Sequence, residues 1–357
     1  MDLSAFDYHL PERLIAQEPP AERDSARMLV VHRGQGRLED RQFRDLPAFL
    51  GPGDCLVLND SRVLPARLFG HRAGTRSLPV GRNNPKRREY LSGRVEVLLL
   101  RPASADAKDW NALVRPGRKM RTGEIIHFEG GMEGEIVARG ELGERTIRFH
   151  AADPWAEFDR IGHVPLPPYI KRSDQPFDRE RYQTVFAREK GSVAAPTAGL
   201  HFTPEVLGRL RECGADIAYV TLHVGLGTFQ PLHTEQIEQA RLHTEHYRIG
   251  EENAARIRRA RRLVAVGTTS VRTLESAARS GPVAQLAAQE GETDIFICPG
   301  YEFRAAGAML TNFHLPRTSL LLLVCAFAGT ELTLAAYRHA VEQEYRFYSY
   351  GDCMLIL

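Results

Sequence analysis

Residues 263–275 read Leu263-Val-Ala-Val-Gly-Thr-Thr-Ser-Val-Arg-Thr-Leu-Glu275. The first four residues are apolar and predict a short buried strand. The chain then turns at Gly267 into a helix, for which Thr268, Thr269 or Ser270 would be the cap. A strand that runs directly into a helix is the repeating unit of α/β proteins. This stretch therefore predicts an α/β layer with a mostly parallel sheet.

The same alternation extends over much of the chain. After residue 154, helical patterns at 204–212 and 251–261 alternate with apolar strand patterns at 218–222, 263–266 and 295–297. Near the start of the chain, residues 28–31 and 53–58 also have the composition of buried strands. We expect both regions to contribute to one α/β unit.

Residues between 64 and 154 have a different character. Short strand patterns, separated by Gly and Pro turns, recur at 95–100, 112–114, 125–128, 134–139 and 145–149. Regularly spaced short strands are typical of a small antiparallel barrel. We therefore predict a discontinuous α/β domain of residues 1–63 and 155–357, with an inserted β-barrel domain at 64–154.

Composition limits the classes of function. Apolar residues make up 43% and charged residues 26% of the 357 residues, and the net charge is only +2. This is the profile of an ordinary globular protein, so nucleic-acid binding would depend on local basic patches. The five cysteines are scattered, which argues against a disulfide framework. The chain begins without a secretory pattern, and its longest apolar run, residues 320–328, is shorter than the ~20 residues of a membrane span. We expect a cytoplasmic protein without a membrane partner.

The first candidate site segment is Asn59-Asp60-Ser61-Arg62, directly after the strand pattern at 53–58. Open α/β sheets bind ligands at the carboxyl ends of their strands, and this position favours a ligand site. An Asx-turn, in which Asp60 and Ser61 bond the local backbone, explains the segment equally well.

The second segment, residues 191–203, consists largely of small and turn-forming residues and includes Thr197, Gly199 and His201. Such a chain lets a ligand approach the backbone closely. It precedes a helix predicted at 204–212, with Thr203 as its N-cap and Pro204 at its first position. A solvent-exposed loop with a surface histidine is the alternative.

The third segment runs from a strand into Gly225-x-Gly227 and continues to His243 and Glu245. His223, His243 and Glu245 are suited to proton transfer near neutral pH. The sequence lacks the H-E-x-x-H pattern of zinc enzymes, and we expect no metal site.

The fourth segment is the strand–turn–helix at 263–275. Its hydroxyl groups and helix N-terminus favour an anionic ligand group over a merely capped helix. Arg272 and Glu275 are three residues apart on this helix and would be able to pair with each other.

Basic residues cluster in three places. Residues 71–94 contain seven Arg or Lys, among them Arg87 and Arg88, and a second cluster includes Arg118 and Lys119. The third lies on the helix predicted at 251–261. Such clusters fit RNA phosphates, although a solvated loop explains the first cluster at least as well.

Taken together, these segments resemble the QueA family, the S-adenosylmethionine:tRNA ribosyltransferase-isomerases. The resemblance extends from Phe6 to Asp352. The matching stretches are 6–17, 58–67, 95–100, 164–172 (which includes Lys171 and Arg172), 181–184, 191–203, 221–231, 266–275, 311–316 and 345–352. The sequence departs from the family pattern at Ala240, where the family usually has histidine, and in the basic insert around 71–92.

The resemblance implies a reaction. The family transfers and isomerises the ribosyl group of S-adenosylmethionine onto 7-aminomethyl-7-deazaguanine at the wobble position of tRNA. The product is epoxyqueuosine, and adenine and methionine are released. S-adenosylmethionine is then a consumed substrate, so no cofactor is expected. We expect the chain to act as a monomer on S-adenosylmethionine and tRNA.

The implied chemistry gives the candidate residues roles. Removal of a C5′ proton, departure of adenine and attack by the amine all need proton transfer, for which His201, His223, His243, Glu245 and Asp60 are candidates. Arg62 or Arg272, with the turn Gly267–Ser270, would hold the methionine carboxylate. The remaining substrate-binding candidates are Asn59, Ser61, Thr197, Gly199, Gly225 and Gly227. The RNA-binding candidates are Arg87, Arg88, Arg118, Lys119, Lys171 and Arg172. A non-catalytic RNA-binding module and another enzyme that modifies the wobble base are the alternatives.

Overall fold

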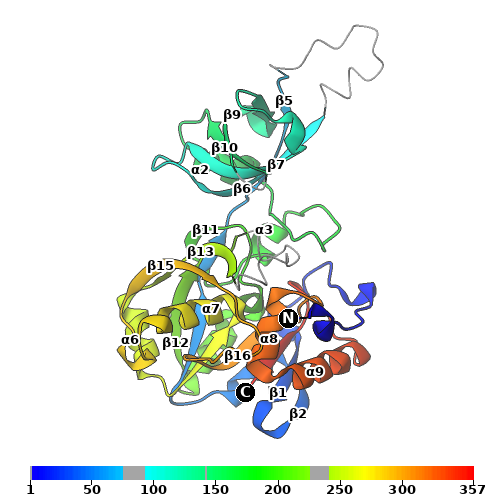
Figure 1. Cartoon of the computed structure of the whole chain (residues 1–357). Coiled ribbons are helices and arrows are strands. Elements are labelled where there is room, and N and C mark those ends of the chain that lie inside the picture. Colours follow the sequence, from blue (N-terminus) through cyan, green and yellow to red (C-terminus); the bar gives the residue numbers. More distant parts are fainter. Residues whose placement is uncertain (1, 75–92, 141–142, 226–240) are drawn as a thin grey trace.

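The computed structural model describes residues 2–74, 93–140, 143–225 and 241–357. The chain forms an α/β part and a separate β-barrel that projects from one end of it (Figure 1). Both chain ends lie in the α/β part (Figure 1).

A nine-stranded sheet is the centre of the α/β part. In spatial order its strands are β15 (Gln289–Ile295), β13 (Arg241–Ile249), β12 (Asp216–Leu222), β3 (Asp54–Asn59), β14 (Arg262–Val266), β16 (Ala306–Asn312), β17 (Cys353–Ile356), β1 (Arg27–His32) and β2 (Arg37–Gln42).

The sheet is mixed, and its four middle strands are parallel. β12, β3, β14 and β16 run in one direction, with Val57 of β3 paired to Ala218 on one side and Ala265 on the other. β17 is antiparallel to β16, and β13, β15 and β2 are also joined by antiparallel pairings. The predicted α/β class is confirmed; the parallel pairings are those among the four middle strands and that of β17 with β1.

Helices cover both faces of the sheet, and successive strand residues alternate between two cores. Leu56 and Leu58 face one core, together with helix α4 (Pro204–Glu212). Val57 faces the other core. The helices of this second face are α6 (Glu251–Arg259), α7 (Gly267–Ala277), α8 (Ser319–Ala328) and α9 (Thr330–Glu342). Because both faces are covered, the middle strands are continuously apolar, which is why the sequence pattern revealed them.

The barrel is closed and antiparallel. Its strands in spatial order are β10 (Glu144–Phe149), β7 (Asp109–Arg115), β6 (Arg94–Pro102), β5 (Arg67–Arg72), β8 (Ile125–Phe128) and β9 (Glu133–Arg139). Trp110 is fully buried in its core and packs edge-on against Trp155 and Phe158 of helix α2 (Pro154–Ile161). The predicted barrel is therefore confirmed, while the domain boundaries at 63/64 and 154/155 stay a prediction.

A short second sheet joins the two parts. In it, β4 (Ser61–Val63) pairs with β11 (Glu189–Ser192) directly before the chain enters the barrel. The remaining helix, α3 (Asp178–Arg181), lies in the segment that returns from the barrel. Among the described residues no single helix is long and apolar enough to cross a membrane, although α8 and α9, bent by 115°, pass a test of length and composition as a pair.

Candidate active site

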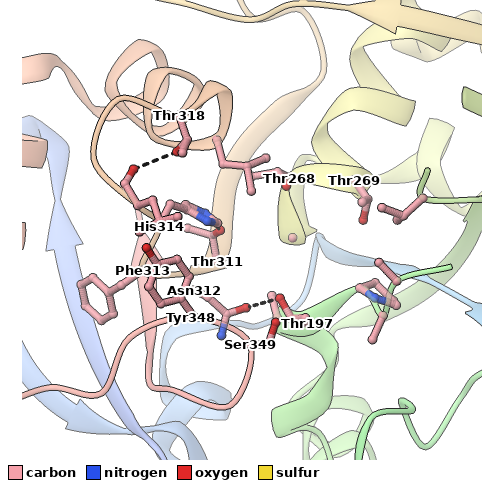
Figure 2. A pocket seen from close by; sticks show the side chains of 18 of the residues that line it. Thr197, Thr268, Thr269, Thr311, Asn312, Phe313, His314, Thr318, Tyr348 and Ser349 are labelled. Atoms are coloured by element: carbon pink, nitrogen blue, oxygen red, sulfur yellow. Dashed lines mark hydrogen bonds between the residues drawn. The ribbon is translucent and has the colours of Figure 1, made fainter. Parts of the chain in front are cut away.

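A cavity of about 480 Å³ lies at the carboxyl ends of β14 and β16. Figure 2 shows side chains from several distant segments around it. The main lining segments are 194–198, 267–269, 311–318 and 348–349. Parallel α/β sheets bind ligands at this edge, and the volume is that of a small-molecule site.

The N-terminus of α7 forms one wall of the cavity. Gly267, Thr268 and Thr269 line it, and Gly267 has a φ of +82°, which a glycine adopts without strain. The expected side-chain cap is wrong, because the helix begins at Gly267 and no side chain caps it. The first N–H groups of the helix are thus not occupied by a cap, and the positive end of the helix dipole favours an anionic ligand group here.

A buried ion pair lies one turn further along α7. Arg272 donates to Glu245 of β13, and the other carboxylate oxygen of Glu245 accepts the backbone N–H of Gly225 at 3.0 Å. The Nε and Nη2 atoms of Arg272 are buried without a hydrogen-bond partner. Arg272 is one turn after Thr268 on the helix that forms the wall, and it is not itself among the lining residues.

The suggested pair between Arg272 and Glu275 does not form. Glu275 is fully buried and accepts hydrogen bonds from the hydroxyl of Tyr301 and from the backbone N–H groups of residues 304–306. The carboxylate of Glu275 therefore fixes the loop before β16, and Arg272 pairs with Glu245 instead.

The elbow after β3 joins two strand ends rather than lining the cavity. Asn59 donates to the carbonyl of Leu222 at 3.0 Å and accepts the N–H groups of Leu222 and Ser61, both at 3.1 Å. Ser61 is buried, whereas Arg62 is exposed. The local backbone bond of an Asx-turn is therefore made by Asn59, and not by Asp60 and Ser61 as the alternative had it.

Asp60 is buried in the same elbow. It accepts the hydroxyl of Thr221 at 2.7 Å. Burial raises the pKa of its carboxyl group, and the bond from Thr221 acts in the opposite direction. A carboxyl group with a raised pKa is better suited to proton transfer near neutral pH than an ordinary aspartate.

His201 is buried beneath the cavity. Its ring packs against Phe43 with a centroid distance of 5.3 Å, and its Nε2 lies 3.3 Å from Nδ2 of Asn312. Burial lowers the pKa of His201 to about 4, so the ring is neutral near pH 7.

The predicted helix at 204–212 is confirmed, with Thr203 accepting the N–H of Val206 at 3.2 Å.

Two further residues of that segment have different positions. Thr197 lines the cavity and donates its hydroxyl to Oδ1 of Asn312 at 2.8 Å (Figure 2). Gly199 instead packs under other side chains, since a β-carbon there would lie 2.8 Å from Thr184 and 2.9 Å from Phe186.

His223 is partly buried beside the small sheet. Its ring covers Gly191, where a β-carbon would lie 2.9 Å from the imidazole. Its Nδ1 is buried without a hydrogen-bond partner. Burial, and secondarily His246, lowers the pKa of His223 and favours the neutral ring. The next residue, Val224, lines the cavity.

Some candidates lie outside what is described. Gly227, Ala240, Arg87 and Arg88 are not among the described residues. The backbone of His243 belongs to β13, but its side chain is not described. Within the described parts of the chain, no group of three or more His, Cys, Asp or Glu side chains is arranged to hold a metal ion.

The remaining RNA-binding candidates differ in exposure and in whether their side chains already pair with an acidic residue. Arg118 is exposed in a short turn that ends at Lys119. Lys171 is exposed and paired with Glu12. Arg172 is held by two bonds to Asp178, of 2.6 and 2.9 Å, so its guanidinium already has a structural partner.

The segments 311–318 and 348–349 contribute cavity residues that the sequence reasoning did not name. His314 bonds the hydroxyl of Thr311 at 2.8 Å, and burial lowers its pKa to about 3. Tyr348 stacks on Tyr169 with a centroid distance of 4.3 Å and has a φ of +72°. Residues 311–316 and 345–352 are among the stretches that resemble the family, and this resemblance is the signal in the sequence that points to them.

Comparison with known proteins decides the family. The model of a family described as "Queuosine biosynthesis protein" matches residues 3–356. The chain belongs to this family. Similar relatives include the S-adenosylmethionine:tRNA ribosyltransferase-isomerases of Solibacter usitatus, 73% identical over 358 residues, and of Symbiobacterium thermophilum, 51% identical over 363 residues. In both cases 100% of each chain is covered.

A solved structure of the family has the same architecture. The crystal structure of S-adenosylmethionine tRNA ribosyltransferase from Thermotoga maritima is 36% identical in sequence. The match covers 99% of this chain and 100% of the other, with a TM-score of 0.53. The family match therefore extends over nearly the full length of the chain, including the residues of the barrel.

Proposed function

We propose that the chain transfers and isomerises the ribosyl group of S-adenosylmethionine onto 7-aminomethyl-7-deazaguanine at the wobble position of tRNA. It is a transferase-isomerase that releases adenine and methionine and leaves epoxyqueuosine in the tRNA. The observation that carries the proposal is the cavity beside the free N-terminus of α7, in a chain that belongs to the queuosine biosynthesis family over its whole length.

The cavity suits S-adenosylmethionine in size and polarity. Its volume of about 480 Å³ lies within the usual range for small-molecule sites. We assign the methionine carboxylate to the N–H groups at Gly267–Thr269, with Arg272 behind them. Apolar lining residues such as Val224, Phe313 and Leu320 would face the uncharged parts of the ligand. S-adenosylmethionine is consumed as a substrate, and no separate cofactor is needed.

The chemistry requires a base for a C5′ proton, because the neighbouring sulfonium makes these protons acidic. His223 is our first candidate, since its ring is neutral and its Nδ1 has no partner. The other candidates are less free: His201 is in contact with Asn312, and Glu245 is held by Arg272 and Gly225. Asp60, with its raised pKa, is the candidate for the second base, which makes the attacking amine neutral.

The tRNA would be held by basic side chains outside the cavity. The exposed arginines of the barrel turn, Arg115, Arg118 and Arg121, have no ion-pair partner among the described residues. Buried Arg145 holds this turn by donating to the backbone carbonyls of Gly117 and Met120, both at 2.9 Å. Because these hydrogen bonds already order the backbone of the turn, its arginines can contact RNA phosphates with little further loss of conformational entropy. We also propose that the protein works in the cytoplasm as a monomer.

One assay separates this function from its alternatives. The protein is incubated with S-adenosylmethionine and tRNA that contains 7-aminomethyl-7-deazaguanine, and the small products are separated. Free adenine and methionine are expected in equal amounts. Release of S-adenosylhomocysteine would indicate methyl transfer, and tRNA binding without any turnover would indicate an RNA-binding module.

A further inference from the structure

Asn312, the last residue of β16, is held by three neighbours at the edge of the cavity. Its Oδ1 accepts the hydroxyl of Thr197 at 2.8 Å (Figure 2). Its Nδ2 lies 3.3 Å from Nε2 of His201 and 3.3 Å from the carbonyl oxygen of Asp352. Asn312 and Thr197 line the cavity, whereas His201 and Asp352 do not.

The carbonyl of Asp352 and the ring of His201 together determine which way the Asn312 carboxamide points. The carbonyl oxygen of Asp352 can only accept a hydrogen bond, so the carboxamide atom of Asn312 that faces it must be the donor Nδ2. The same Nδ2 lies against Nε2 of His201, so in the neutral imidazole this nitrogen is the acceptor. Only the Nδ2 group of Asn312 can donate to it, and the reversed carboxamide would place an oxygen against an acceptor nitrogen.

The fixed orientation gives the cavity an edge of hydrogen-bond acceptors. Both hydrogens on Asn312 Nδ2 are directed to His201 and Asp352, away from the cavity. A carbonyl oxygen has two lone pairs, so Oδ1 has one left after the bond from Thr197. The hydroxyl hydrogen of Thr197 is used in that bond, and its oxygen can only accept from a ligand.

This acceptor edge adjoins the donor wall of α7. Ala198, next to Thr197, lies against Gly267, where a β-carbon would be 3.7 Å from that of Ala198. A ligand carboxylate on the N–H groups of α7 would therefore place a group on its α-carbon near Asn312 and Thr197. In an amino acid that group is a charged ammonium, which has three donors.

We infer that His201 is a positioning residue that holds Asn312 and Thr197 as acceptors for the α-ammonium group of S-adenosylmethionine. The inference rests on the proposed function and deepens it. It also gives His201 a different role from that of a proton-transfer group. Loss of a charge-assisted hydrogen bond of this kind weakens binding about ten- to a hundredfold.

The test measures binding of S-adenosylmethionine and of its deamino analogue by calorimetry, without tRNA. The wild type is expected to prefer S-adenosylmethionine at least tenfold. His201→Phe keeps an aromatic ring against Phe43 but removes the acceptor, and Asn312→Leu removes the carboxamide. Both are expected to bring the preference close to one, and the double variant should lose no more than Asn312→Leu alone.

Two control variants distinguish a positioning role of His201 and Asn312 from a general loss of stability. Asn253→Leu removes another hydrogen-bonded asparagine, which accepts the N–H of Tyr219 at 2.8 Å away from the cavity. It should lower stability and leave the preference unchanged. His201→Gln, which again offers an acceptor, should restore part of the preference.

Four results would overturn the inference. One is an unchanged preference in His201→Phe, and another is additive losses in the double variant. The third is a loss of turnover beyond a hundredfold with normal binding, which would make His201 a general base. A preference for the 2′-hydroxyl instead, measured with the 2′-deoxy analogue, would move the acceptor edge to the ribose and also contradict the assignment. The binding measurements need no turnover, so they are independent of the adenine-release assay that tests the function; only the third result requires that turnover is measured as well.

Discussion

Arg272 of α7 and Glu245 of β13 form an ion pair in which both side chains are only 5% exposed. They are 27 residues apart in the sequence, and the pair ties the helix that forms the cavity wall to the antiparallel edge of the sheet. The backbone N–H of Gly225 completes the contact by bonding the second oxygen of Glu245.

Removal of one partner of this pair should destabilise the protein strongly. Arg272→Ala leaves Glu245 buried without its cation, and such losses cost about 3–5 kcal/mol. The control is Arg262→Ala at the amino-terminal end of β14, away from the cavity. Arg262 donates to the carboxylate of Asp54 at 2.7 and 2.8 Å, but its side chain is 35% exposed. We expect about 1 kcal/mol there. Urea unfolding measures both free energies, and equal losses would contradict the argument.

Gly267→Ala should weaken binding of S-adenosylmethionine. A β-carbon meets only Thr269 Oγ1 at 3.6 Å and Ala198 at 3.7 Å, so the cost comes from the φ of +82° rather than from a clash. The strain is about 1–2 kcal/mol and would shift the start of α7. Gly36→Ala, with a φ of +61° and open space around it, is the matched control. Both should lower stability similarly, and only Gly267→Ala should lower affinity about tenfold. Equal affinities in the two variants would argue against a ligand at this helix end.

Buried histidines should make the protein sensitive to acid. Burial lowers the pKa of His314 to about 3, so the folded protein does not take up the proton that the unfolded chain binds below pH 6.5. Stability from this residue is therefore full above pH 6.5 and falls as the pH decreases towards 3. At pH 5 the loss is about 2 kcal/mol. His314→Gln should reduce the difference in unfolding free energy between pH 7 and pH 5 by about that amount. A variant with the wild-type pH dependence would show that His314 is not protonated on unfolding.

The barrel turn should contribute to tRNA affinity through charge. Arg118→Ala and Arg121→Ala are each expected to weaken tRNA binding and to reduce the slope of log affinity against log salt by about one. Arg148→Ala is the control on the same barrel, because Arg148 already pairs with Asp109 at 2.8 Å. Filter binding at several salt concentrations measures the slopes. Equal slopes for all three variants and the wild type would place the RNA elsewhere.

Local patterns predicted much of the fold. The apolar run at 263–266 and the helix at 204–212 appear in the structure as β14 and α4. Both were predictable because the spacing of apolar residues along the sequence reflects which faces of an element are buried. The direction of β17 was not predictable, since a four-residue apolar strand has no local feature that makes it antiparallel to β16. The mixed sheet follows from that tertiary pairing.

The sequence also predicted part of the candidate site, namely the part that depends on local patterns. Gly267, Thr268 and Thr269, which follow the strand β14, line the cavity, and so does Thr197 from the loop of small residues. The pairing of Arg272 with Glu245, rather than with Glu275, depends on contacts between distant segments that spacing along a helix cannot reveal. The roles of His201, His223 and Asp60 in the reaction stay predictions.

The central claim is that S-adenosylmethionine serves as a ribosyl donor, and a double-label experiment tests it most directly. S-adenosylmethionine carrying one isotope in the ribose and another in the sulfonium methyl group is incubated with the protein and tRNA that contains 7-aminomethyl-7-deazaguanine. We predict that the ribose label enters the tRNA while the methyl label remains in free methionine. Transfer of the methyl label to the tRNA, with the ribose label left in S-adenosylhomocysteine, would contradict the account.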